Sequence, residues 1–379
     1  MSQVVSSRRD DYVQTLCFGK SVRIPLTPGA GRRSTRERWY QEGLPPGTVG
    51  ADILAEACRQ AGIEPDAQSG WEPGYAIDTR MNPMFEEKVL EVRENSQVVQ
   101  DWKGNICEIG LEYTTEYLRS AIDFVTRRWI KCPVESRTDW LEMRRRYDPD
   151  TPERYPALPT VDLSRRDYPL QMAFSGPYWI LREWCGFEGL SMMFYDNPSL
   201  VREMIEFWEQ FILTIMERTF KVCVPDQVHI SEDMAFKGHM MLSKEMCREF
   251  LMPTWRRWGD FIRRHGVPIY AVDSDGHVGE LIPLWIECGV TCCDPVEVAA
   301  GNDMVAYRRQ YGRQMAFRGG VDKRAMAKGG KHIDQELARL RPVIESGGFI
   351  PGCDHAVPAD VSWPNFVYYV KRLAEAIGR

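Results

Sequence analysis

The sequence lacks any segment that would place the protein in or across a membrane. No apolar run approaches the roughly 20 residues that a helix needs to cross a bilayer. The first residues, MSQVVSSRRDD, also lack the hydrophobic stretch of a secretory signal peptide. We therefore expect a cytoplasmic protein without a membrane partner.

The sequence also has little excess charge of either sign. The formal net charge is −6, and lysines and arginines alternate with acidic residues instead of forming a basic stripe. A nucleic-acid partner is therefore not expected. The 11 cysteines include no CxxC pair, which excludes a zinc ribbon or a dithiol redox motif. Their scattered positions predict reduced thiols, most of them buried as small apolar side chains.

The first part of the chain, residues 1–160, is irregular and rich in proline and glycine. It contains one clear β-hairpin pattern, KVLEVRENSQVVQDWKGNICEIGLEY, which alternates in polarity and turns at Lys103-Gly104. We interpret this part as an elaboration that also carries the first strands of the main fold.

A different sequence pattern begins near residue 168, where short apolar runs alternate with longer amphipathic segments. This alternation is typical of βα units. The predicted strands are LQMAFSG, DQVHISED, VPIYAVDSDG, VTCCDPVE, QMAFRGGVD and GGFIPGCDH. The predicted helices include residues 199–220, 243–266 and 333–348.

These units predict an α/β protein, specifically a (β/α)8 TIM barrel with an irregular N-terminal elaboration that includes the β-hairpin. A doubly wound open sheet is the alternative, but no GxGxxG follows any predicted strand. We expect one domain over residues 1–379, in which residues 161–379 hold the main βα repeats.

Acidic residues stand at the end of nearly every predicted strand. In a (β/α)8 barrel, the carboxyl ends of the strands carry the chemistry. The alternative is that each acid only caps the following helix, which suits Asp294 and Asp354. The polar residues at these strand ends are Glu232, Asp233, Asp273, Asp275, Asp294, Glu297, Asp322, Cys353, Asp354 and His355.

Four segments together resemble the uroporphyrinogen decarboxylase superfamily. They are SVRIPLTPGAGRRSTRERWYQEGLP, FSGPYWILREWCGFEGLSMMFYDNPSLVREM, RGGVDKRAM and GCDHAVPADVSWPNF. The resemblance implies a single (β/α)8 barrel and one of two chemistries. These are the decarboxylation of tetrapyrroles and the transfer of methyl groups to or from a corrinoid cobalt.

The decarboxylase branch carries an arginine-rich motif of the form MRQAGR near its N-terminus. Here the corresponding stretch reads PGAGRRSTRER, which has arginines but not the motif. Arginines at a helix start are also typical of a solvated helix face. No clear match exists for the segment that carries the decarboxylase aspartate, and MNPMFEE is the nearest stretch. Authentic uroporphyrinogen decarboxylation is therefore disfavoured.

The methyltransferase branch carries a zinc site made of His-x-Cys and a later cysteine. Here DSDG takes the place of His-x-Cys-Gly, so the resemblance implies Asp273 and Asp275 as metal ligands, with Cys353 or His355 as the third. Alternate residues of a strand point the same way, as two ligands must. Such a set accepts zinc or another divalent metal, and His277 is expected to orient a carboxylate. The alternatives are an Asp helix cap, a buried thiol and a core histidine.

The resemblance then implies a metal-dependent methyltransferase. Its donor would be a methoxylated aromatic or a methylamine, and its partner a separate corrinoid protein, because the sequence has no Asp-x-His-x-x-Gly cobalamin motif. Glu232 is expected to carry a proton or bind the metal, and Asp322 to anchor a loop or substrate through hydrogen bonds. The alternatives are a decarboxylase-like lyase and a binding barrel without catalysis. The sequence leaves open whether the protein forms a homodimer.

Overall fold

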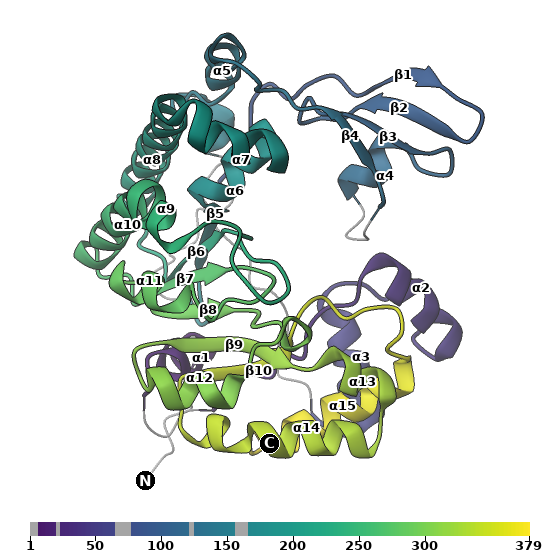
Figure 1. The fold of residues 1–379 in the computed structure, drawn as a ribbon. Helices are drawn as coiled ribbons and strands as arrows, with labels where there is room; N and C mark the ends of the chain where they lie inside the picture. The colour runs from purple at the N-terminus through teal and green to yellow at the C-terminus, as the bar shows by residue number, and fades with distance from the viewer. Residues whose placement is uncertain (1–6, 20–22, 65–76, 121–124, 156–165) are drawn as a thin grey trace. The chain divides into compact units, whose positions relative to one another are not determined.

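The computed structural model describes residues 7–19, 23–64, 77–120, 125–155 and 166–379 (Figure 1). Residues 21 and 22, which begin the first segment of the family resemblance, lie outside the described residues. The chain divides into two compact units. The parallel-sheet unit comprises residues 1–75, 159–174 and 222–379, and the antiparallel-sheet unit comprises residues 76–158 and 175–221. No helix among the described residues is long and apolar enough to span a membrane.

The parallel sheet has six strands that lie side by side in their sequence order. They are β5 (Gln171–Ser175), β6 (Gln227–Ser231), β7 (Ile269–Asp273), β8 (Cys292–Asp294), β9 (Ala316–Val321) and β10 (Phe349–Cys353). The ladders from β6 to β10 are all parallel. Each of the six predicted strands is present, so the prediction of a parallel α/β fold is confirmed.

The predicted closed eight-stranded barrel is not confirmed, because the described residues form six parallel strands and no closed barrel. The extended segment 27–31 lies beside the end of β10, where the N–H of Cys353 donates to the Pro28 carbonyl at 3.0 Å. One parallel bridge joins Gly31 to Val357. Pro25 and Pro28 have no N–H to donate, which explains why this segment forms isolated bonds instead of a regular ladder.

Helices follow the strands of the parallel-sheet unit in alternation (Figure 1). They are α9 (Lys244–Met246), α10 (Met252–Arg264), α11 (Ile282–Glu287), α12 (Met304–Tyr311), α13 (Lys323–Lys328), α14 (Lys331–Glu345) and α15 (Trp363–Ala376), together with a 3-10 turn at Val298–Ala300. The N-terminal segment adds α1 (Arg8–Leu16), α2 (Arg33–Glu42) and α3 (Ala51–Ala61). The predicted helix at 243–266 is interrupted by a π-helical turn, Cys247–Leu251. Pro253 accounts for it, because its ring displaces the carbonyl four residues earlier.

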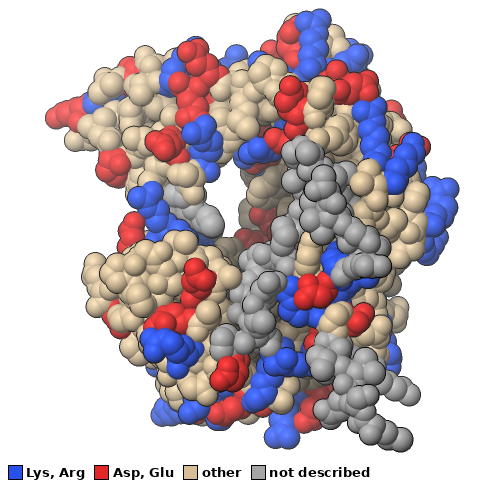
Figure 2. All heavy atoms as spheres, turned by 180° about the vertical axis from the view of Figure 1, so that it is seen from behind, with Lys and Arg blue, Asp and Glu red and all other residues tan. Residues whose placement is uncertain are grey.

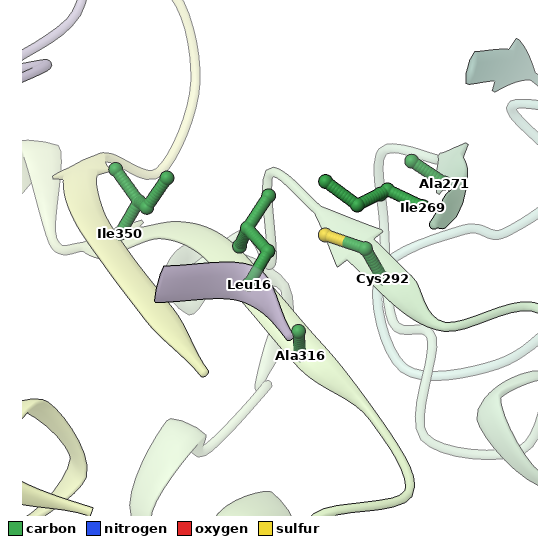
Figure 3. Packing of buried hydrophobic residues seen from close by; sticks show 6 residues of the cluster. All are labelled: Leu16, Ile269, Ala271, Cys292, Ala316 and Ile350. Atoms are coloured by element: carbon green, nitrogen blue, oxygen red, sulfur yellow. The ribbon is translucent and has the colours of Figure 1, made fainter. Parts of the chain in front are cut away.

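A small apolar core lies on one face of the parallel sheet (Figure 3). Leu16 of α1 packs against residues of four neighbouring strands, namely Ile269, Ala271, Cys292, Ala316 and Ile350. Side chains alternate between the two faces of a strand. Ile269, Ala271 and Asp273 therefore share one face of β7, so this face turns from apolar to acidic towards the carboxyl end of the strand.

The antiparallel-sheet unit contains four strands, β1 (Lys88–Val92), β2 (Ser96–Gln100), β3 (Ile106–Gly110) and β4 (Arg128–Lys131). It also contains α4 (Thr115–Ser120), α5 (Arg137–Met143), α6 (Pro177–Cys185), α7 (Phe187–Asp196), α8 (Pro198–Phe220) and 3-10 turns at Arg144–Arg146 and Pro152–Arg154. The predicted hairpin turn is confirmed between β2 and β3. There Gly104 has φ +86°, and the Asp101 carboxylate accepts the N–H groups of Lys103 and Asn105 at 2.9 Å.

Acidic and basic side chains are interspersed over the described part of the surface in Figure 2. This view agrees with the alternation of charge along the sequence.

Candidate functional site

Three aspartates meet at the carboxyl ends of β6 and β7. Asp233 follows β6 by two residues, Asp273 ends β7, and Asp275 follows two residues later. One carboxylate oxygen from each lies within 4.8 Å of the others. The backbone N–H of Asp275 donates to Oδ1 of Asp233 at 2.8 Å, which ties the two loops together. We call Asp233, Asp273 and Asp275 the carboxylate triad.

Asp273 is the member of the triad whose negative charge is least favourable. Burial raises the pKa of its carboxyl group well above the usual range, and the nearby charges of Asp294, Asp233 and Asp275 raise it further, against a smaller opposing effect of Arg318. Within the described part of the chain, no hydrogen bond reaches the Asp273 carboxylate. A partly buried carboxylate without a protein donor is stabilised by binding a proton or a cation.

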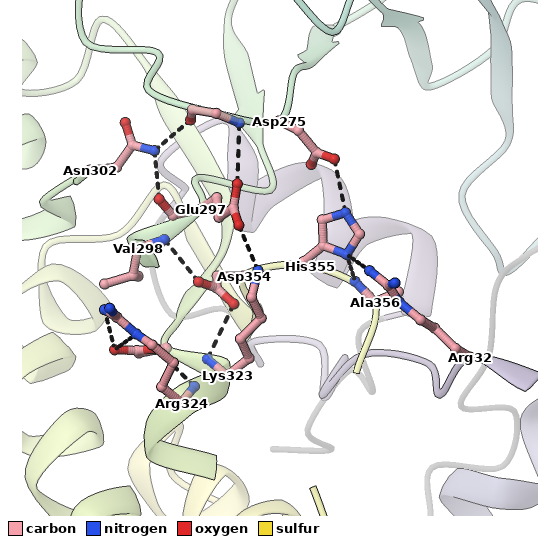
Figure 4. Close-up of polar contacts among 12 residues, drawn as sticks. Arg32, Asp275, Glu297, Val298, Asn302, Lys323, Arg324, Asp354, His355 and Ala356 are labelled. Carbon is pink, nitrogen blue, oxygen red and sulfur yellow. Dashed lines mark hydrogen bonds and ion pairs between the residues drawn. The ribbon is translucent and has the colours of Figure 1, made fainter. Parts of the chain in front are cut away.

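His355 reaches the triad through Asp275 (Figure 4). Its Nε2 lies 2.9 Å from Oδ2 of Asp275. Its Nδ1 lies 2.7 Å from the backbone nitrogen of Ala356 and 3.0 Å from a guanidinium nitrogen of Arg32. The structure thus places His355 as a hydrogen-bond partner of one triad member. Whether it binds a metal stays a prediction.

Cys353 lies apart from the triad in the structure. Cys353 ends β10. Ile350, on the same strand, belongs to the apolar core beside the triad, and because side chains alternate along a strand, Cys353 lies on the opposite face of the sheet. Burial raises the pKa of the Cys353 thiol, so the group is a neutral thiol when no metal is bound. The structure therefore brings Asp273 and Asp275 together with Asp233, but not with Cys353.

A network of polar side chains lies on the same face of the sheet as Asp273. Asp294 contacts His229 Nε2 at 3.1 Å and Arg318 at 3.5 Å. Arg318 also donates to the hydroxyl oxygen of Tyr12 at 3.1 Å, and this hydroxyl donates to Gln227 at 2.6 Å. Burial acts to raise the pKa of Asp294, but Arg318 and His229 bring it below the usual value. Asp294 is thus an ion-paired carboxylate and not a helix cap.

The three residues predicted as catalytic have different surroundings. Glu232 is fully buried, and its carboxylate accepts the indole N–H of Trp255 at 2.8 Å. Asp322 caps α13 by accepting the N–H of Arg324 at 2.8 Å. The Nδ1 atom of His277 is buried and has no hydrogen-bond partner among the residues that the structure describes. The catalytic roles of Glu232, Asp322 and His277 stay predictions.

A second charged group lies at the ends of β8, β9 and β10 (Figure 4). Lys323 Nζ lies 2.7 Å from Glu297 Oε1. The two oxygens of Asp354 accept the backbone N–H groups of Val298 at 2.8 Å and Lys323 at 3.2 Å. We call Glu297, Lys323 and Asp354 the Lys323 cluster. Burial raises the pKa of Asp354 to about 6, although Lys323 acts against that rise.

The Lys323 cluster also supports the loop that carries the triad. Glu297 accepts the N–H of Gly276 at 3.3 Å, and Asn302 donates to the Gly276 carbonyl at 2.8 Å. Val296 has φ +55°, a conformation that strains a β-branched residue and that directly precedes Glu297. Hydrogen bonds to the backbone of Gly276 therefore hold the loop after Asp275 in place.

Sequence reasoning missed several residues of this region. Strand alternation would have found Arg318, because it lies two residues after Ala316 on the inward face of β9. His229 has the same kind of signal in β6. Tyr12 and Arg32 lie far away in sequence, and no local pattern indicates their contacts. The reading of the N-terminal arginines as a solvated face fits Arg33, which pairs with Glu37, but not Arg32.

The family model for uroporphyrinogen decarboxylase (URO-D) matches residues 129–376, which is more than half of the chain. The protein therefore belongs to the uroporphyrinogen decarboxylase family, as its sequence resemblance predicted. No curated protein matches it.

The solved structures that are similar to this chain include the following two. A methyltransferase from Methanosarcina mazei has 13% sequence identity and a TM-score of 0.55, covering 98% of this chain and 99% of its own. A B12-independent methionine synthase from Shewanella sp. W3-18-1, in complex with selenomethionine, has 10% identity and a TM-score of 0.42, covering 93% of this chain and 97% of its own. The first likeness shows a shared fold.

Proposed function

We propose that the protein is a metal-dependent methyltransferase, which moves a methyl group between a small methylated donor and a corrinoid held by a separate protein. The observation that carries the proposal is the carboxylate triad at the carboxyl ends of β6 and β7. This is the edge at which α/β barrels place their chemistry. The methyltransferase from Methanosarcina mazei, which shares the fold, is consistent with this class of activity.

The composition of the triad suits a divalent cation. Asp233, Asp273 and Asp275 would supply oxygen ligands, and the cation would offset the repulsion that raises the pKa of Asp273. Oxygen ligands suit hard ions such as manganese and are also accepted by zinc. When bound, the metal would act as a Lewis acid on the heteroatom that carries the methyl group.

The neighbouring residues would prepare this site. His355 contacts Oδ2 of Asp275 and so fixes the direction of that carboxylate. Arg318 and His229 keep Asp294 ionised below the triad, so Asp294 adds a fixed negative charge near the proposed ion. The donor is proposed to be a methoxylated aromatic or a methylamine, and the corrinoid is proposed to come from a partner protein.

A second candidate is a metal-free lyase that acts by proton transfer. Two observations favour it, namely membership of the uroporphyrinogen decarboxylase family and the raised pKa of Asp273. A protonated Asp273 would be a general acid that donates its proton to a carbanion left by the loss of carbon dioxide.

Two measurements separate these candidates. Protein purified without chelator should contain about one divalent metal ion per chain by elemental analysis. A methoxylated aromatic or a methylamine should then give methyl-cobalt absorbance only when this protein and a reduced corrinoid protein are both present. The proposal fails if the protein contains no metal and decarboxylates a tetrapyrrole without a corrinoid, which is the result that the lyase predicts.

A matched pair of variants checks that the triad is the metal site. Asp233→Asn should lose the metal, whereas Asp322→Asn should keep it, because the Asp322 carboxylate caps α13 and pairs with Arg324. Equal metal content in the two variants would refute the assignment of the metal to the triad.

A further inference from the structure

We propose that Arg32 is a positioning residue, which holds the His355 ring so that its Nε2–H group points at Oδ2 of Asp275. This inference deepens the proposed function, and it rests on that function only for what Asp275 binds. The orientation of His355 is a separate property that is measured without any ligand.

The first step is the proton position on His355. A backbone N–H and a guanidinium group are both pure donors, and both lie at Nδ1, from Ala356 at 2.7 Å and from Arg32 at 3.0 Å. Nδ1 must therefore accept, and the proton of the neutral ring is on Nε2. That N–H faces Oδ2 of Asp275 at 2.9 Å, so the ring donates to the carboxylate.

The second step is the placement of Arg32. It directly precedes α2, and its backbone N–H donates to the Val357 carbonyl at 3.3 Å. The same carbonyl accepts the hydroxyl of Thr35 at 2.8 Å, and Gly31 forms a bridge to Val357. The loop of Arg32 is thus bonded to the loop of His355, although 323 residues separate the two side chains in sequence.

The third step is the effect on Asp275. Its backbone N–H donates to Asp233, and the next N–H donates to Glu297, so the main chain is fixed on both sides. The Nε2–H group of His355 then donates to Oδ2. In the part of the chain that the structure describes, Oδ1 of Asp275 has no hydrogen-bond partner. Arg32 thereby acts through His355 to leave one oxygen of Asp275 open for a ligand.

The neighbouring arginine offers a matched control. Arg33 pairs with Glu37 at 3.1 Å on the exposed side of α2, so its side chain serves a different partner. Arg32→Met removes one of the two donors at Nδ1, leaves the Ala356 N–H in place and keeps much of the aliphatic length. Arg32→Lys retains a cationic donor, and Arg33→Met changes the adjacent charge.

The test uses full-length protein labelled with ¹⁵N-histidine and long-range ¹H–¹⁵N correlation spectra, which distinguish the two tautomers. The His355 signals are assigned by their loss in His355→Gln. We expect the Nε2–H tautomer in the wild type and in Arg33→Met. Arg32→Met should show averaged nitrogen shifts from a mobile ring, and Arg32→Lys should restore them at least in part. Unchanged His355 shifts in a folded Arg32→Met would overturn the proposal.

A second readout connects the ring to the triad. Mn²⁺ titration followed by electron paramagnetic resonance should show affinity about 10–100-fold weaker in Arg32→Met, as expected for the loss of a residue that orients a ligand. Arg33→Met should bind as the wild type does. If wild-type protein binds neither Mn²⁺ nor Zn²⁺, the metal in the proposed function is refuted, and the tautomer spectra still decide the role of Arg32. If Arg32→Met fails to fold, the spectra and affinity of Arg32→Lys decide, and a wild-type tautomer with Nδ1–H would refute the proposal.

Discussion

The carboxylate triad and the Lys323 cluster lie at the carboxyl ends of the same parallel strands, but their charges are compensated differently. In the Lys323 cluster, Glu297 pairs with the lysine ammonium group, and Asp354 accepts two backbone N–H groups. In the triad, Asp273 lies among other carboxylates, without a donor in the described part of the chain. The number of acids at a strand end is therefore less informative than the partners of each acid.

The difference has an energetic meaning. A buried charge that lacks a partner costs stability, whereas a paired or hydrogen-bonded charge recovers much of its lost hydration. Proteins break such local rules mainly at functional sites. We therefore assign the Lys323 cluster to holding the loops and the triad to binding a ligand, and the following experiments test this division.

The largest effect is expected for Asp273→Asn. Loss of a charged ligand should weaken metal binding by at least about tenfold. Without metal, the variant should be more stable than the wild type at pH 7. The reason is that a raised carboxyl pKa stabilises the fold below about pH 4 and loses this contribution as the pH rises through the folded-state pKa. Elemental analysis and urea unfolding in chelator measure both effects, and a variant that retains metal and unfolds more easily would contradict the division.

Lys323→Met should have the next largest effect, and on stability. The substitution leaves Glu297, whose side chain is 22% exposed, without its cation. We expect a loss of about 1–3 kcal/mol in the free energy of unfolding, as for other buried groups that lose a partner. Urea denaturation of metal-free protein measures it. A variant as stable as the wild type would show that the Lys323 cluster does not hold the loops.

Asp354→Asn should change the pH dependence of stability. The folded-state pKa of Asp354 is about 6, above the unfolded value, so its contribution is complete below about pH 4 and is lost as the pH rises to about 6. The wild type should therefore lose on the order of 1–2 kcal/mol more than the variant between pH 4 and 6.5. Urea unfolding at both pH values tests this, and parallel pH profiles would disprove it.

The smallest effect is expected for Arg324→Met, the control for Lys323→Met. Arg324 pairs with Asp322, but its own side chain is 56% exposed. Exposed ion pairs contribute little, so the free energy of unfolding should change by less than about 1 kcal/mol. A loss as large as that of Lys323→Met would mean that burial does not distinguish the two neighbouring cations.

The sequence predicted the fold more completely than the site. The six strands from β5 to β10 were each recognisable, because an apolar run followed by glycine or an acid is a local pattern. The eight-stranded closure was not recovered among the described residues. The prolines near residue 27 keep that segment from forming a regular ladder beside β10. Asp273 and Asp275 were predicted as a pair from the family resemblance, with strand alternation in support, and the structure adds Asp233 to them.

By itself, the sequence determined the parallel strands, the hairpin turn at Lys103-Gly104 and the presence of acids at the strand ends. These features follow from the conformational preferences and polarity of neighbouring residues. Only the tertiary structure decided which acids meet, that Cys353 lies apart from them, and that Arg32 contacts His355. Such pairings depend on strand register and on loops hundreds of residues apart, and no local pattern in the chain encodes them.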